Sequence, residues 1–153
     1  MTATNHALTG AVIGVLIGKP LVAIPLAIVS HFVCDALPHF GYSRQTFRKI
    51  VVKSTIFRNY LYVEAGICFL IVVALAGFQP AHWQLAAVCA FAAASPDFLS
   101  YNRYRSQRLG KPWRPNVYAS FASGIQWFER PIGAVVEIAW AIAAVAILVP
   151  FIR

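Results

Sequence analysis

The sequence predicts an all-α integral membrane protein, a single domain over residues 1–153 with about five transmembrane helices and one or two interfacial amphipathic helices. Hydrophobic residues make up 59% of the chain and charged residues 12%, whereas about 25% of a soluble protein is charged. The mean hydropathy is +0.67. Ten of the thirteen Lys and Arg residues lie in two stretches, 41–58 and 99–115, between apolar segments.

Five apolar segments are the predicted membrane helices. They cover residues 4–18, 20–38, 59–78, 82–97 and 131–151. A bilayer core of about 30 Å needs about 20 helical residues, with about 17 as the usual minimum, and the second, third and fifth segments meet this. The first and fourth are shorter and rich in Ala and Gly. We expect these two inside the bundle, because small residues let helices approach closely.

The connections between these segments predict two turns and two surface helices. Lys19-Pro20 and residues 77–83 are typical of tight turns. Residues 44–58 are basic with interspersed Phe, Ile and Val, which predicts an amphipathic helix on an anionic membrane surface. Residues 115–130 place apolar side chains at helical spacing, which predicts a second interfacial helix before the last segment.

The net charge of +8 bears on orientation more than on nucleic-acid binding. In a soluble protein this excess would suggest a nucleic-acid partner. Here the basic residues cluster between apolar segments, as the positive-inside rule expects of cytoplasmic loops. We therefore predict membrane lipids and no nucleic acid as partners, with the N-terminus inside. No Lys or Arg precedes residue 19, so the first segment lacks the basic start of a signal peptide.

The ionisable residues gather at one predicted membrane face. Eight of the nine Asp, Glu and His residues map to the inner side, and only His82 maps to the outer side. Each charge at the centre of a span costs about 2.5–3.5 kcal/mol, and a shared polar cavity around a cation would offset that cost. The eight residues are His6, His31, Asp35, His39, Glu64, Asp97, Glu129 and Glu137.

This grouping predicts a metal site. His31 and Asp35 are four residues apart, so their Cβ atoms would lie about 5–6 Å apart on one helical face. Pro38 should end that helix near Leu37 and leave His39 on the following loop. The foremost predicted ligands of a divalent transition metal (zinc, manganese or iron) are His6, His31, Asp35 and Asp97, followed by His39 and Glu64.

Glu129 and Glu137 are the candidate general bases of such a site. Glu137 lies in a segment without a basic residue, so we expect its side chain inside the bundle, within reach of His31 or Asp35 directly or through water. Other interpretations remain open for these groups. His31 and Asp35 would also suit a hydrogen-bonded pair without a metal, Glu64 an ion pair with a nearby Arg, and His39 or Glu129 a solvated surface.

Two short stretches, NHALTGAVIG and SHFVCDALPHF, resemble the bacterial membrane-bound metal-dependent hydrolase family of the LexA-regulated inner-membrane type. The resemblance implies that His6, His31 and Asp35 are metal ligands, and SPDF looks like the family's Pro-Asp motif at Asp97. The segment IQWFERPIGAVVE is similar to the closing segment of small relatives, which suggests roles for Gln126, Glu129 and Glu137. The chain departs from the family at Phe98-Leu99, which replace Asp-His, and it has no H-R-G-x-T-H motif.

The resemblance implies a hydrolase of the bacterial inner membrane that takes a lipid or phosphate-bearing substrate from the inner face, such as a phospholipid or a polyprenyl phosphate. Two other classes of function fit the same pattern. The residues would also form an ion, proton or metal transport path, although His82 alone on the outer side argues against a continuous route. A non-catalytic membrane partner subunit would use the polar cluster only for structure.

Overall fold

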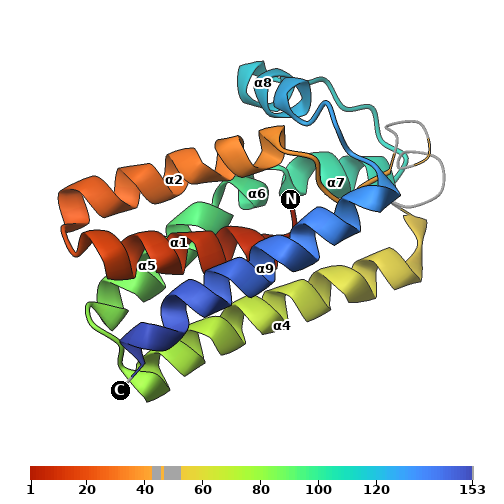
Figure 1. The fold of residues 1–153 in the computed structure, drawn as a ribbon. Helices are drawn as coiled ribbons and strands as arrows, with labels where there is room; N and C mark the ends of the chain where they lie inside the picture. The colour runs from red at the N-terminus through yellow and green to blue at the C-terminus, as the bar shows by residue number, and fades with distance from the viewer. Residues whose placement is uncertain (43–45, 47–52, 153) are drawn as a thin grey trace.

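The computed structural model describes residues 1–42, 46 and 53–152, and the only regular elements in these ranges are helices (Figure 1). All five predicted apolar segments are helical. They form α1 (Ala3–Ile17), α2 (Pro20–Ala36), α4 (Thr55–Phe78), α5 (Trp83–Ala94) and α9 (Ala134–Leu148), the last flanked by the 3-10 turns η2 (Pro131–Gly133) and η3 (Val149–Phe151). The all-helical fold class is therefore confirmed.

Local sequence signals set the ends of the first two helices. The Thr2 side chain accepts a hydrogen bond from the Asn5 backbone N–H and caps α1, a role for which Thr is favoured. Gly18 ends α1 in the left-handed conformation, with φ of 63°, which glycine adopts without strain. Pro20 then occupies the first turn of α2, where its missing N–H costs nothing. The predicted hairpin at Lys19-Pro20 is confirmed.

Small residues place α1 directly against α5, the helix formed by the fourth apolar segment. A Cβ added to Gly10 would lie 2.1 Å from the Cys89 carbonyl oxygen, and one added to Gly14 would lie 2.4 Å from the Ala86 Cα. These glycines therefore allow a backbone contact that alanine would block. The expectation that the first and fourth segments pack inside the bundle is confirmed by the burial of their Ala and Gly residues.

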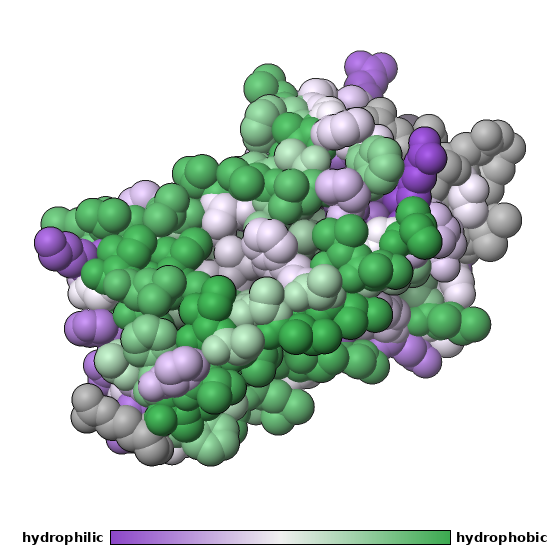
Figure 2. Space-filling view, viewed as in Figure 1, coloured by the Kyte–Doolittle hydropathy of each residue, from purple (hydrophilic) through white to green (hydrophobic). Residues whose placement is uncertain are grey.

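Two helices are long and apolar enough to cross a membrane, Thr55–Phe78 and Pro131–Phe151. Only 6% and 22% of their most apolar windows are buried, whereas the core helix of a soluble protein would be mostly buried. Their apolar side chains lie on the outside, and the visible face of the molecule is largely hydrophobic (Figure 2). The helices α1 and α2 are apolar but shorter, so five membrane spans are not shown.

The connections differ from the prediction in extent. The basic stretch 99–115 contains α7 (Tyr101–Arg108), which follows the short α6 (Pro96–Leu99). The predicted interfacial helix over 115–130 is limited to α8 (Val117–Ile125), because residues 128–130 instead pair with the backbone of His39. Most of the predicted amphipathic helix over 44–58 lies outside the described residues, and its last four residues form the first turn of α4.

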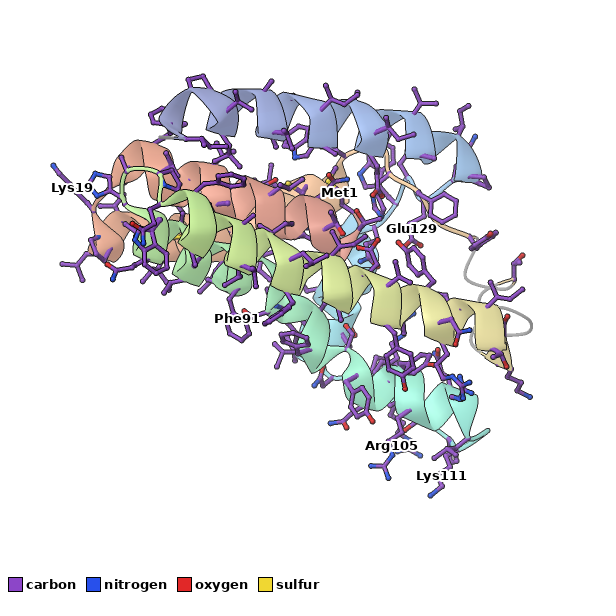
Figure 3. All side chains as sticks on the ribbon, turned by 90° about the horizontal axis from the view of Figure 1, so that it is seen from below. Met1, Lys19, Phe91, Arg105, Lys111 and Glu129 are labelled. Carbon is purple, nitrogen blue, oxygen red and sulfur yellow. The ribbon has the colours of Figure 1, made fainter. Side chains whose placement is uncertain are left out.

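The bundle has two chemically different ends. Lys19 lies at the end formed by the first hairpin, whereas Arg105 and Lys111 lie at the opposite end (Figure 3). The start of α1, the end of α2 and the whole of α7 and α8 lie toward this second end (Figure 1). The predicted ligands carried by α1, α2 and α6 are therefore brought to the basic end of the bundle.

Candidate metal centre

Three buried side chains from α1 and α2 meet near the basic end of the bundle. The Nε2 atom of His6 lies 3.1 Å from Oδ1 of Asp35, and the Nε2 atom of His31 lies 3.5 Å from its Oδ2. None of the three residues is more than 3% exposed. One ligand atom from each lies within 4.8 Å of the others, so the cluster could hold a metal ion.

Both histidines turn Nε2 toward the Asp35 carboxylate, and a hydrogen bond to the backbone orients the ring of His31. Nδ1 of His31 lies 2.9 Å from the backbone carbonyl oxygen of Ala93 on α5. That carbonyl can only accept, so Nδ1 donates the proton, and Nε2 faces the Asp35 carboxylate. The rings of His6 and His31 are stacked with their centroids 4.0 Å apart. A protein partner that fixes the second ring nitrogen is typical of metal-binding histidines.

The spacing of the ligand atoms fits a metal of ordinary coordination chemistry. Zinc binds His nitrogen and carboxylate oxygen at about 2.0–2.2 Å, so neighbouring ligands of a tetrahedral site lie about 3.3–3.6 Å apart. The His6 and His31 nitrogens lie 3.1 and 3.5 Å from the two different oxygens of Asp35, and one ligand atom from each residue lies within 4.8 Å of the others, so a bound ion would draw the three ligands slightly together. The Nδ1 atom of His6 is buried without a hydrogen-bond partner, so the ring is held through the contact of its Nε2 with Asp35.

Asp97 supplies a fourth ionisable group next to the three buried residues. Its Oδ1 atom lies 3.8 Å from Nε2 of His31, and its side chain is 43% exposed. The exposure is toward a cavity that Asp97 helps to line. The four foremost predicted ligands therefore lie together, with Asp97 beside the buried cluster of His6, His31 and Asp35.

Asp35 is the centre of this arrangement. The side-chain amide of Gln126, in the segment after α8, donates to its Oδ2 at 2.9 Å. The amino group of Met1 also contacts its Oδ1. Asp35 therefore interacts with groups from four parts of the chain, and Gln126 holds the carboxylate in a fixed orientation.

The remaining predicted residues form separate pairs around the first turn of α1. Glu64 accepts hydrogen bonds at 2.9 Å from both the backbone N–H and the hydroxyl of Thr4. His39 is buried, with Nε2 3.7 Å from Oε1 of Glu129. These groups lie outside the three-residue cluster, so the predicted funnel of eight residues is divided into several local interactions.

Glu137 is buried, as expected, and its carboxylate joins three segments. Its Oε2 accepts from the Thr2 backbone N–H and the Asn5 side chain, both at 3.1 Å, and its Oε1 accepts from the Phe40 N–H at 3.0 Å. In the described part of the chain, its hydrogen bonds go to these groups and not to the His31–Asp35 pair. Glu137 thus ties the start of α1 and the chain after α2 to α9.

A cavity of about 990 Å³ lies beside the cluster. Its polar lining includes Glu64, Asp97, Gln126 and Glu129. Its apolar lining comes mainly from α4, with contributions from α5 and α6, and includes Phe57, Leu61, Phe69, Val72, Phe91 and Phe98. Figure 3 shows the Phe91 side chain projecting outward from α5. The cavity therefore combines an apolar wall with carboxylates near the candidate metal ligands.

Three features of the site have no signal in the sequence or only an indirect one. The Ala93 carbonyl that orients His31 is a backbone atom, so its residue type carries no information. Asn5 was recognised only as part of a motif, although its side chain binds Glu137. Gln126 was suggested only by the resemblance.

Compared with known proteins, the chain matches no family model, no curated protein and no solved structure.

Proposed function

We propose that the protein is a metal-dependent hydrolase of the bacterial inner membrane, with its N-terminus inside. The observation that carries this proposal is the buried His6–His31–Asp35 cluster beside a large cavity with an apolar wall. In the resemblance to the LexA-regulated membrane-bound hydrolases, the same three residues would be the metal ligands, which agrees with this proposal. In this proposal all five apolar helices lie within the membrane and the cluster faces the cytoplasmic side.

Zinc, manganese or iron(II) suits this mixture of imidazole and carboxylate ligands. When bound, such an ion supplies Lewis acidity that polarises a phosphoryl or acyl oxygen and makes water more acidic. The protein holds the ligands in place through the Ala93 carbonyl and the Gln126 amide. Asp97 faces the cavity, so it is placed to act as an exchangeable ligand or to accept a proton from the attacking water.

Of the two glutamates expected to serve as the base, Glu129 is the better placed. It lines the cavity, is 29% exposed in its side chain, and lies beside His39. Glu137 has both oxygens occupied by hydrogen-bond donors, which would have to be broken before it accepted a proton. We therefore assign Glu137 to holding the site together and Asp97 or Glu129 to proton transfer.

The cavity favours an amphiphilic substrate. Its apolar wall suits a hydrocarbon chain, and its carboxylates and amide lie where an ester group would meet the metal ligands. A phospholipid or polyprenyl phosphate would enter from the inner leaflet beside α4. Water would then form a new bond to phosphorus or to the acyl carbon, the ester bond would break, and the leaving oxygen would take a proton.

Transport is less well supported by the packing. His82 lies beside Gly18 at the far end of the bundle, and between it and the cluster α1 and α5 are in backbone contact at Gly10 and Gly14. The buried residues along this contact are mainly alanines and glycines. A polar path between His31 and His82 would require these helices to separate.

The test is hydrolysis by the purified full-length protein in detergent, with zinc, manganese or iron(II) added in turn. Phosphatidic acids with short and long acyl chains would be supplied, and released phosphate and fatty acid measured. We expect release that needs metal, increases with chain length and is lost in His31→Ala. The variant His82→Ala is the matched control and should retain activity. Equal release by His31→Ala, or none from any substrate with any of the metals, would contradict the proposal.

A further inference from the structure

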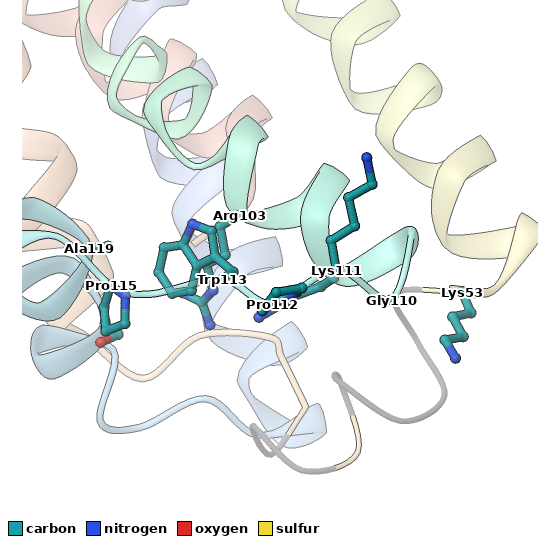
Figure 4. A pocket seen from close by; sticks show the side chains of 10 residues that line it. Lys53, Arg103, Gly110, Lys111, Pro112, Trp113, Pro115 and Ala119 are labelled. Atoms are coloured by element: carbon teal, nitrogen blue, oxygen red, sulfur yellow. The ribbon is translucent and has the colours of Figure 1, made fainter.

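A second cavity, of about 600 Å³, lies at the basic end of the bundle, away from the candidate metal ligands (Figure 4). We call it the basic pocket. Its lining comes from α7, the chain that follows it, α8 and a residue two positions before α4: Lys53, Arg103, Gln107, Gly110, Lys111, Pro112, Trp113, Pro115, Ala119 and Ser123. None of the proposed metal ligands or bases is part of this lining.

The charged residues in the described lining of the basic pocket are all basic. Lys53, Arg103 and Lys111 are its charged residues, and no Asp or Glu is among the described lining residues. Figure 4 shows Arg103 beside Trp113, with Lys111 between them and Lys53. The Arg103 guanidinium lies 5.6 Å from the centre of the Trp113 ring, a cation–π contact. Like charges collected around a concave surface create a positive potential that favours an anion.

The elements that form the basic pocket also carry exposed apolar side chains. On α8, Ala119 and Ser123 line the pocket, whereas Val117 and Phe121 lie on the opposite face of this helix and are 89% and 53% exposed. Leu109, between α7 and the pocket residues, is 56% exposed. A helix with one face of exposed apolar residues beside basic groups is typical of segments that lie in a membrane interface. Trp113 is also of the residue type enriched at that depth.

The position of the basic pocket agrees with a membrane interface. Lys53 comes two residues before Thr55, where the membrane-length helix α4 begins. The pocket therefore lies at the level where that apolar helix would leave the hydrocarbon layer. A free phosphate ion would use only the cations, whereas a lipid would use the cations and the neighbouring apolar surface together.

We propose that the basic pocket binds the phosphate headgroup of an anionic membrane phospholipid. Lys53, Arg103 and Lys111 supply the positive charge for the phosphate, and the acyl chains lie along Leu109 and the start of α4. This site is separate from the metal centre and does not depend on hydrolysis. Arg103 and Gln107 line both cavities, so α7 is the wall between the headgroup site and the proposed substrate cavity.

The experiment measures lipid retention by the full-length protein in a neutral detergent, using native mass spectrometry. Phosphatidylglycerol, phosphatidylcholine and inorganic phosphate are supplied in separate titrations. We expect bound phosphatidylglycerol, much weaker retention of phosphatidylcholine, and no displacement by phosphate at the same concentration. Each basic residue near an anionic surface changes affinity by about fivefold, so the double variant Lys53→Gln/Lys111→Gln should weaken retention by about 25-fold.

Two charge-matched controls identify the pocket itself. Arg105 is exposed on α7 but is not in the lining, and Lys19 lies at the other end of the bundle. Arg105→Gln and Lys19→Gln should each change retention less than twofold. A loss in Arg105→Gln as large as in Lys111→Gln would overturn the proposal in favour of a diffuse surface charge. Equal retention of phosphatidylcholine, or displacement by phosphate, would overturn it as well. His31→Ala should retain the lipid, whatever its effect on hydrolysis.

Discussion

The substitution Glu137→Gln distinguishes a structural role for this residue from a catalytic one. The carboxylate accepts three hydrogen bonds, from Thr2, Asn5 and Phe40, and the residue is only 5% exposed. If the amide oxygen of the glutamine faces Thr2 and Asn5, its NH₂ group must face the Phe40 N–H. The glutamine NH₂ group and the Phe40 N–H, both donors, would then face each other at the position where the carboxylate now accepts from Phe40.

The magnitude follows from these contacts. A hydrogen bond to a charged group contributes about 1.5–3 kcal/mol, so losing the bond to Phe40 and weakening the other two costs more than one such bond. Removing a buried charge offsets part of this loss. We expect a decrease of about 2–4 kcal/mol in the free energy of unfolding, which corresponds to a fall of about 5–15 °C in Tm for a chain of this length.

Thermal unfolding of the detergent-purified protein, followed by tryptophan fluorescence, measures this change. Glu129→Gln is the matched control, because Glu129 is partly exposed and faces His39 at 3.7 Å, and its loss should cost less than about 1 kcal/mol. The reasoning would be refuted if Glu137→Gln unfolded at the wild-type temperature but had lost metal or hydrolysis. That result would return Glu137 to the role of a base.

Three further predictions concern packing, the cavity and orientation. Gly10→Ala places a methyl group against the α5 backbone and should destabilise the protein by about 1–3 kcal/mol. In the control Gly66→Ala the added methyl group meets nothing within 4 Å, so thermal unfolding should show a loss of stability in the first variant and none in the second. Ala65→Trp fills part of the large cavity and should abolish hydrolysis of long-chain lipids while the bound metal is retained, as metal analysis and activity on one sample would show. A cysteine at Lys111 should react with a membrane-impermeant reagent only from the cytoplasmic side, and one at Lys19 only from the periplasmic side; the opposite pattern would reverse the orientation.

Much of the fold could be predicted from the sequence because its signals are local. Gly18 and Pro20 mark the first hairpin through their backbone preferences, and α2 ends at Ala36, close to the predicted Leu37. The small residues of α1 and α5 also predicted which helices would be inside. The number of membrane spans could not be predicted in the same way. The helices α1 and α2 have only 15 and 17 residues, so their place in a bilayer depends on the neighbouring helices as well as on their length.

The site could be predicted only where side chains of one helix face the same way. The spacing of His31 and Asp35 placed both on one face of α2, as the structure shows. Two of the partners of Glu137 are the backbone N–H groups of Thr2 and Phe40. They could not be predicted, because nearly every residue has a backbone N–H and the sequence does not show which of them meets the carboxylate. The pairing of His39 with Glu129 likewise depends on how the segment after α8 passes the end of α2.

The most direct test of the central claim is the metal content of the purified protein. Wild-type protein, prepared without chelators and analysed by inductively coupled plasma mass spectrometry, should contain about one transition-metal ion per chain, because the three ligands form one site. His31→Ala and Asp35→Ala should lose the ion, whereas His82→Ala should keep it. A folded wild-type protein that binds no zinc, manganese or iron even after they are added, or a His31→Ala variant with the full metal content, would contradict the assignment of a metal centre.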